Sequence, residues 1–268
     1  MLAALEDVSF GYGDHAVLDE ASLSLERGQV VGLLGLNGSG KTTTMRLIAN
    51  ILEPVKGSVR REFRKLGYLP EERGLYRKMA VGRYLEFIAA LDGLRGRAAR
   101  LGVAEWMERF GLEIYAKSRI DALSKGNQQK VQLVATLMGQ PDLLLWDEPF
   151  SGLDALNQEL LIEVLKDSRK HGVTILLSTH RIEDLESWAD SHFMLVEGHF
   201  YPYHPPERPA HYAIDTGLTT TTVAAAELPQ AITRLTANGQ VIRQVRAESG
   251  LAHTFKTLLA ERTGHAAQ

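Results

Sequence analysis

Short apolar runs alternate with stretches of helical periodicity along the first two hundred residues. Continuous or alternating apolar positions predict strands at 2–10, 21–25, 30–34, 57–61, 65–69, 143–146, 173–178 and 193–196. Apolar residues spaced by three or four positions predict helices over 43–52, across 80–140, over 155–171 and from about Ile182. Strands with intervening helices indicate a mostly parallel sheet covered by helices, so the expected fold class is α/β.

The same pattern divides the chain into three parts. Residues 1–200 are expected to form the main domain, with an antiparallel β subdomain at its start and a helical insert at about 75–140. Four prolines within 201–209 predict a linker, which we place at 201–212. Beyond it, a β-α-β-α order predicts a small C-terminal α/β domain over 213–268, from runs at 219–224, 228–237, 240–245 and 251–262.

Residues 35–42 read GLNGSGKT and join the predicted strand 30–34 to a predicted helix. In a strand–loop–helix context this pattern predicts a nucleoside triphosphate site and a P-loop NTPase core. The glycines let backbone N–H groups turn toward phosphates, and the helix N-terminus adds positive charge. Lys41 can reach the β- and γ-phosphates, and the Thr42 hydroxyl can bind Mg²⁺. The alternative is an ordinary glycine-rich turn. The expected phosphate-binding residues are Asn37, Gly38, Ser39, Gly40, Lys41, Thr42 and Thr43.

A second glycine pattern is not expected to bind a nucleotide. Residues 11–16 fit a loose G-x-G-x-x-A dinucleotide pattern. The residues that follow, 17–25, have the pattern of a turn and a strand, whereas a pyrophosphate would require a helix there. We therefore expect a strand in this segment.

The apolar strand 143–146 is followed directly by Asp147 and Glu148. In a P-loop protein the first acid holds Mg²⁺, and the second can orient or deprotonate the water that attacks the γ-phosphate. Two acids at a strand end are more often solvated carboxylates. Together with the phosphate loop, however, they favour a catalytic site.

Composition narrows the classes of function. The net charge of -3 and the pI near 6.3 do not suggest a nucleic-acid binder, so no nucleic-acid partner is expected. The absence of cysteine excludes disulfides and thiolate chemistry. No apolar run approaches the ~20 residues that span a bilayer, and the first ten residues lack the features of a signal peptide. We expect a cytoplasmic protein that works at a membrane only through a partner.

Residues 123–130 read LSKGNQQK and open a predicted helix, with Ser124 suited to the N-cap position. Such a helix end could be structural only, or could offer its amides to a phosphate. The order of motifs is then phosphate loop, helical insert, L-S-x-G-x-Q-Q-K, apolar-D-E, S-G-L-D at 151–154, and S-T-H at 178–180. With this order the chain resembles the ATP-binding cassette (ABC) ATPases over about residues 1–198.

The resemblance implies a Mg²⁺-dependent ATPase with roles for single residues. It implies that Tyr12 stacks on adenine and that His180 contacts the γ-phosphate, although a lone tyrosine or histidine more often only packs. Glu148 matches the catalytic base, and Asp147 matches the acid that holds Mg²⁺. Ser124 and Gly126 would act in trans on the ATP of another subunit. The expected assembly is therefore a homodimer or a pair of ATPase subunits that closes on ATP.

Two segments depart from the usual family pattern. Lys125 and Asn127 replace family residues in the segment 123–130, which corresponds to the signature motif of the family. In the segment 68–76, which reads YLPEERGLY, Glu71 stands where the family commonly has a glutamine near the metal and the attacking water. The resemblance therefore implies a carboxylate facing Mg²⁺, with altered metal affinity and slower hydrolysis.

These two segments and the C-terminal tail resemble the sodium-exporter-type branch of bacterial ABC-2 exporter ATPases. That branch pairs with separate transmembrane permease subunits, which implies an efflux ATPase lying peripherally on the inner face of the cell membrane. The C-terminal domain would then regulate the ATPase or brace its dimer. One alternative is a soluble ABC ATPase acting on ribosomes or DNA, although such proteins usually carry two cassettes or long coiled-coil insertions. Another, a binding-only protein, is disfavoured because Lys41, Asp147, Glu148 and His180 are all present.

Overall fold

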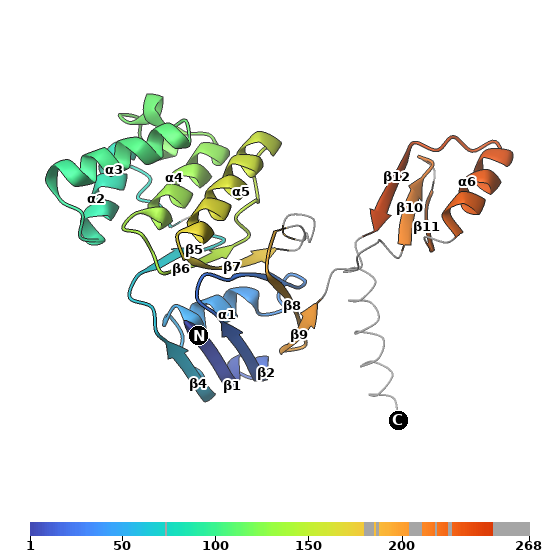
Figure 1. The fold of residues 1–268 in the computed structure, drawn as a ribbon, viewed down its shortest axis with the longest axis horizontal. Coiled ribbons are helices and arrows are strands. Elements are labelled where there is room, and N and C mark those ends of the chain that lie inside the picture. Colours follow the sequence, from blue (N-terminus) through green and yellow to red (C-terminus); the bar gives the residue numbers. More distant parts are fainter. Residues whose placement is uncertain are drawn as a thin grey trace. The chain divides into compact units, whose positions relative to one another are not determined.

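The computed structural model describes residues 1–72, 74–179, 185, 188–203, 211–217, 219–224 and 227–248. The chain forms two compact units, Met1–Pro202 and Tyr203–Gln268. The first unit holds the predicted phosphate loop and both acids of the strand at 143–146, so it positions the site (Figure 1).

A six-stranded sheet runs through the centre of the first unit, with the order β5-β6-β7-β3-β8-β9. Neighbours from β5 to β8 pair in parallel. The edge strand β9 follows β8 after only two residues, Glu197 and Gly198, both with positive φ, so it must return antiparallel. The strands are β3 (Val30–Leu34), β5 (Leu66–Leu69), β6 (Leu143–Asp147), β7 (Thr174–Thr179), β8 (Ser191–Val196) and β9 (His199–Tyr203). The predicted α/β class with a mostly parallel sheet is confirmed.

Strands β3, β6 and β7 are buried at every position, because this sheet is covered on both faces. Successive residues of β6 face opposite sides, as the pleat of a strand requires. Leu144 and Trp146 join one apolar core, and Leu143 and Leu145 join the other. One continuous apolar run thus holds two layers together.

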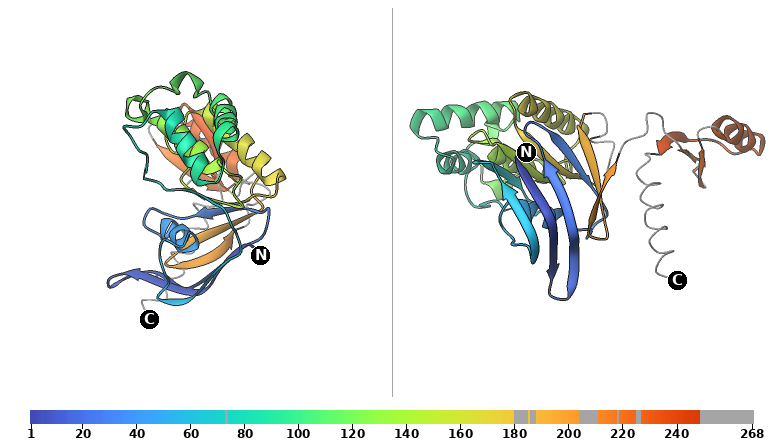
Figure 2. Two further views of the ribbon diagram at one scale, coloured as in Figure 1. Left: turned by 90° about the vertical axis from the view of Figure 1, so that its left-hand side faces the viewer. Right: turned by 60° about the horizontal axis from the view of Figure 1, so that its bottom comes forward.

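The first core lies under helices α2 (Val81–Leu91), α3 (Gly96–Arg109), α4 (Lys125–Leu137) and α5 (Ala155–Lys170). Two short 3₁₀ helices, η1 (Glu113–Tyr115) and η2 (Ile120–Ala122), connect α3 to α4. Figure 2 shows these four helices together on one side of the central sheet. Among the described residues, no helix is long and apolar enough to cross a membrane.

The second core lies between the central sheet and an antiparallel sheet with the order β2-β1-β4. Its strands are β1 (Ala3–Tyr12), β2 (His15–Leu25) and β4 (Lys56–Arg61), and helix α1 (Lys41–Ile48) packs in the same layer. The predicted antiparallel subdomain is confirmed, and so is the strand expected at 17–25. The G-x-G-x-x-A segment therefore lies in a hairpin and does not open a helix.

Two boundaries in the first unit differ from the sequence predictions. Helix α1 ends at Ile48 and not at 52, and Asn50 just beyond it has a left-handed φ of 59°. Strand β9 extends the sheet beyond 193–196, which we expected to be the last strand. Pro202 lies in β9, which tolerates it because an edge strand has one side without ladder hydrogen bonds. The helix predicted from Ile182 falls largely outside the described residues.

The second unit contains β10 (His211–Asp215), β11 (Thr220–Ala224), α6 (Leu228–Ala237) and β12 (Gln244–Glu248). The strands form an antiparallel sheet in the order β11-β10-β12, and a small core of Ile214, Val223 and Ala231 joins it to α6. Strand β10 was not predicted, because its first residues were assigned to a proline-rich linker. The helix predicted at 251–262 lies outside the described residues.

Candidate active site

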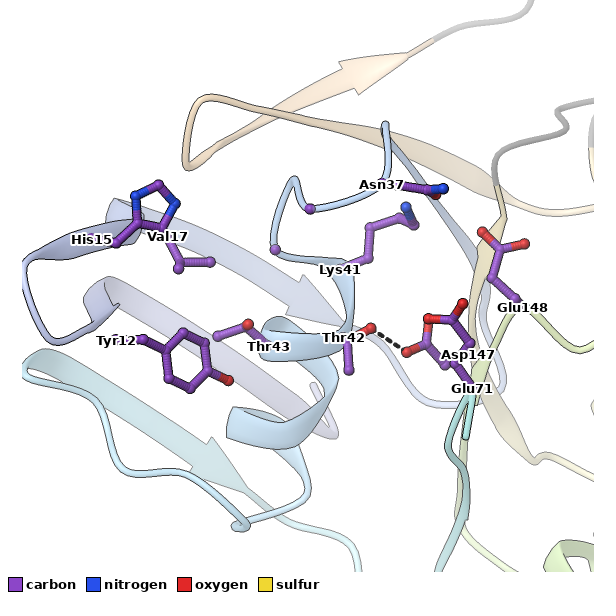
Figure 3. A pocket seen from close by; sticks show the side chains of 12 residues that line it. Tyr12, His15, Val17, Asn37, Lys41, Thr42, Thr43, Glu71, Asp147 and Glu148 are labelled. Atoms are coloured by element: carbon purple, nitrogen blue, oxygen red, sulfur yellow. Dashed lines mark hydrogen bonds between the residues drawn. The ribbon is translucent and has the colours of Figure 1, made fainter. Parts of the chain in front are cut away.

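A pocket of about 460 Å³ forms where the carboxyl ends of β3, β5 and β6 meet the start of α1 and the β1–β2 hairpin (Figure 3). The carboxyl edge of a parallel sheet is where such folds bind their ligands. Most predicted site residues line this pocket: Tyr12, Asn37, Gly38, Gly40, Lys41, Thr42, Thr43, Glu71, Asp147 and Glu148.

The loop between β3 and α1 depends on glycine at two positions. Gly38 and Gly40 have φ values of 81° and 108°, which residues with a Cβ rarely adopt. A Cβ at Gly40 would also come within 2.9 Å of Val17 Cγ1. Gly40 is the N-cap of α1, so the loop brings the positive end of this helix to the pocket.

Lys41 lies at the first position of α1 and is only 6% exposed. Its ammonium donates to the carbonyl oxygens of Gly35 at 2.9 Å and Leu36 at 3.1 Å. Burial lowers the pKa of Lys41, and the carboxylates of Glu148, Asp147 and Glu71 oppose that shift. The Lys41 ammonium is therefore bound to the backbone of the loop, and three carboxylates lie close enough to raise its pKa.

Asp147 is 1% exposed, and both of its carboxylate oxygens accept hydrogen bonds. Thr42 donates to Oδ2, and Ser178 on the neighbouring strand β7 donates to Oδ1. The parallel register places Asp147 directly beside Ser178. A buried carboxylate requires such partners, and these two fix its orientation toward the start of α1.

Glu148 adopts a left-handed backbone conformation with φ of 51°, which is uncommon for a residue other than glycine. Its backbone N–H donates to the Ser178 hydroxyl oxygen at 3.0 Å. Figure 3 shows the Glu148 side chain on the same side of the pocket as Asp147. Backbone strain of this kind is typical of functional sites, where the surrounding structure holds it in place.

Glu71 follows β5 in an exposed loop and lines the same pocket. Its carboxylate lies near enough to Lys41 to raise the lysine pKa. With the Thr42 hydroxyl and the Asp147 carboxylate, the pocket offers hard oxygen donors of the kind that Mg²⁺ prefers. The residues present therefore fit a magnesium ion bound together with phosphates.

The opposite side of the pocket comes from the β1–β2 hairpin. Tyr12 at the end of β1 is 48% exposed, and its ring meets Phe10 edge-on with centroids 5.1 Å apart. His15 and Val17 on β2 also line the pocket, and sequence analysis missed both. The position of His15 in the sequence, just beyond the turn that follows Tyr12, could have indicated its place, because the two residues pair across the hairpin. The hairpin thus presents an aromatic ring where a planar base can stack.

Some predicted residues are not brought into this pocket. Ser39, Ser124 and Gly126 are not among the lining residues. Ser124 caps α4 by accepting from the N–H of Asn127 at 3.3 Å, and a Cβ at Gly126 would lie 3.5 Å from the carbonyl oxygen of Gly152. His180 lies outside the described residues.

Comparison with known proteins decides the family. The family model for the ABC transporter matches residues 18–151. The chain is 41% identical over 205 residues to the uncharacterized ABC transporter ATP-binding protein YhaQ of Bacillus subtilis, covering 74% of this chain and 69% of YhaQ. The chain belongs to the ABC transporter ATPase family. An ABC ATPase binds and hydrolyses ATP, so the chain is an ATP-hydrolysing enzyme.

Solved structures agree with this assignment. One, described as an ATP-binding subunit of an ABC transporter, matches with a TM-score of 0.71 and 28% identity, over 87% of this ABC ATPase and 94% of that chain. Another is an ATP-binding cassette solved as a dimer with ADP and Pi. It matches with a TM-score of 0.70 and 22% identity, over 76% of this chain and 98% of that chain, so it supports the fold alone.

Proposed function

We propose that this ABC ATPase is the Mg²⁺-dependent motor subunit of an efflux transporter and drives a separate transmembrane permease. The observation that carries the proposal is the convergence of Lys41, Thr42, Asp147 and Glu148 in one pocket. A protein that only binds ATP would need the phosphate-binding loop, but it would not need Glu148 in a strained backbone conformation at the edge of the pocket.

Each residue has a role that its position can support. The backbone amides at the start of α1 and the Lys41 ammonium would hold the β- and γ-phosphates. Thr42 and Asp147, with Glu71 beside them, would hold Mg²⁺, which neutralises charge on the phosphate oxygens when bound. Glu148 would accept the proton of the attacking water. Tyr12 would stack on the adenine ring, and we retain His180 as the expected contact to the γ-phosphate.

The signature motif is proposed to act on the ATP that a second subunit holds. Ser124 and Gly126 are absent from the pocket of their own subunit, and Ser124 is exposed at the N-terminus of α4. The amides and hydroxyl of this helix end suit an anion, so we propose that they close on ATP held by a second ATPase subunit. Opening after hydrolysis would return the pair to its starting state.

The permease, the direction of transport and the location rest on the motifs at 68–76 and 123–130, which resemble those of the sodium-exporter-type branch. We propose that the cassette lies on the inner face of the cell membrane and that residues 75–140 and the loop at 68–76 transmit its motion to the permease. We also propose the division into an ATPase domain at 1–200, a linker at 201–212 and an accessory domain at 213–268. The accessory domain would regulate the ATPase or brace the dimer.

Phosphate release by the purified protein tests the enzymatic part of this proposal. Wild type should release phosphate from ATP only when Mg²⁺ is present. Glu148→Gln should reduce release by about 10²–10⁴-fold, whereas Glu72→Gln should not change it, because Glu72 is a nearby exposed acid that does not line the pocket. Equal loss in both variants, or release without Mg²⁺, would contradict the assigned roles.

A further inference from the structure

Charge is distributed unevenly along this acidic chain. Residues 75–140 contain eleven Lys and Arg against six Asp and Glu, whereas the whole chain contains 30 against 33. The helical part therefore carries a net positive charge, and the rest of the chain a larger negative one. The electrostatic attraction of a partner and binding to a charged surface depend on such local charge and not on the net charge of the whole chain.

The excess of positive residues is concentrated where α2 ends and α3 begins. Arg95, Arg97 and Arg100 lie within six residues, and no acid occurs between Asp92 and Glu105. All three arginine side chains are exposed. With the described residues they form no ion pair or side-chain hydrogen bond, whereas Arg109 at the other end of α3 pairs with Asp167. The three positive charges face solvent.

These arginines do not help the helix that carries them. Arg95 is the N-cap of α3 and makes no side-chain capping hydrogen bond, and the first turn contains no acid. The N-terminus of a helix carries partial positive charge, so cations there are unfavourable. Features that violate local stability rules are expected at functional sites.

Two exposed leucines flank the arginines. Leu91 at the end of α2 is 69% exposed, and Leu101 on α3 is 59% exposed. Arg97, Arg100 and Leu101 share one face of α3, because residues three and four apart lie side by side on a helix. We term these exposed residues the basic corner: Leu91, Arg95, Arg97, Arg100 and Leu101. The two helices that carry them, α2 and α3, lie at the end of the first unit away from the β2-β1-β4 sheet (Figures 1 and 2).

We propose that the basic corner binds the anionic headgroup surface of a membrane. Guanidinium groups pair with lipid phosphates, and neighbouring exposed leucines can enter the apolar boundary below the headgroups. The leucines favour a bilayer over a nucleic acid, which has no apolar layer to receive them. The contact would hold the cassette beside its permease and so deepens the proposed function, on whose membrane location it rests.

Vesicle flotation of the purified full chain tests the proposal without permease, nucleotide or turnover. Wild type should bind vesicles of phosphatidylglycerol and phosphatidylcholine, but not vesicles of phosphatidylcholine alone. Binding should fall in 0.5 M NaCl, because salt screens exposed charges. Each surface cation contributes about fivefold in affinity, so R95Q/R97Q/R100Q should lose about a hundredfold.

The matched control removes three exposed cations elsewhere, in K56Q/K166Q/K170Q. It should bind vesicles as wild type does. L91S/L101S should lose affinity while keeping all three arginines. ATPase activity and thermal unfolding of each variant should match wild type, which shows that the fold is intact.

Wild type that binds both kinds of vesicle equally, or binds neither, would overturn the proposal. A control variant that loses as much affinity as the arginine variant would also overturn it. Loss of RNA binding without loss of vesicle binding in R95Q/R97Q/R100Q would instead assign the basic corner to nucleic acid. Each of these results is independent of Mg²⁺-ATP hydrolysis, so failure here leaves the assigned ATPase chemistry standing.

Discussion

The backbone N–H of Glu148 donates to the hydroxyl oxygen of Ser178 at 3.0 Å, across the boundary between β6 and β7. The same hydroxyl donates to the carboxylate of Asp147. One buried serine therefore fixes the backbone of one acid and the side chain of the other. We regard Ser178 as a positioning residue, because it reaches the site only through these two acids.

Ser178→Ala should lower kcat for ATP hydrolysis by about tenfold while changing the KM for ATP little. It removes a donor to Asp147 and an acceptor for the Glu148 N–H, and an unpaired buried group costs about 1–3 kcal/mol of stability. Ser178→Thr keeps the hydroxyl and should recover most of kcat if its methyl group is accommodated. A serine that mattered only for stability would lower the unfolding temperature and leave kcat per folded molecule unchanged.

Glu148→Gln should reduce turnover by about 10²–10⁴-fold, the usual contribution of a general base, and should still bind ATP. With Mg-ATP bound and hydrolysis blocked, the closed dimer should accumulate. Size-exclusion chromatography with light scattering should report twice the monomer mass. A variant that remains monomeric without any partner would weaken the homodimer and favour a heteromeric pair.

Glu71→Gln should weaken the apparent affinity for Mg²⁺ and raise turnover, because it replaces a carboxylate in the pocket with a neutral amide. The measurement is phosphate release as a function of free Mg²⁺ at saturating ATP. Glu72→Gln carries the same change one residue further on, outside the pocket lining, and should behave as wild type. Unchanged Mg²⁺ dependence and turnover in Glu71→Gln would refute a role for this acid.

Burial lowers the pKa of Lys41 below its ordinary value of 10.5. Between the lowered pKa and 10.5, the unfolded chain binds a proton that the folded protein has lost, so the Lys41 contribution to stability should rise with pH. ATP phosphates favour the charged ammonium, so ATP affinity should fall as pH rises through the lowered pKa. Lys41→Arg stays charged and should flatten that fall. A wild-type affinity that does not fall as the pH is raised toward 10.5 would contradict the assignment.

The phosphate loop and the two acids could be predicted from sequence because each depends on a local pattern. Residues 35–42 lie between one strand and one helix, and Asp147 and Glu148 directly follow an apolar run. Their convergence follows from parallel pairing, which brings the ends of several strands to one edge. The strand–helix alternation was enough to predict it.

Ser178, His15 and Val17 were not predicted, because their roles come from how strands pair in space. Ser178 matters through its register with Asp147, and a strand sequence does not reveal its register. His15 reaches the pocket through the hairpin that pairs it with Tyr12. Strand β9 was not predicted, because Pro202 argues against a strand unless the strand is known to lie at an edge.

Co-purification is the direct test of whether this ATPase drives a membrane permease. Glu148→Gln, expressed in its native cell and trapped with Mg-ATP, would be isolated from detergent-solubilised membranes and its partners identified by mass spectrometry. A membrane protein with several transmembrane spans should co-purify with this ATPase. Recovery of ribosomes or DNA with no membrane protein would contradict the transporter assignment and leave only the ATPase chemistry.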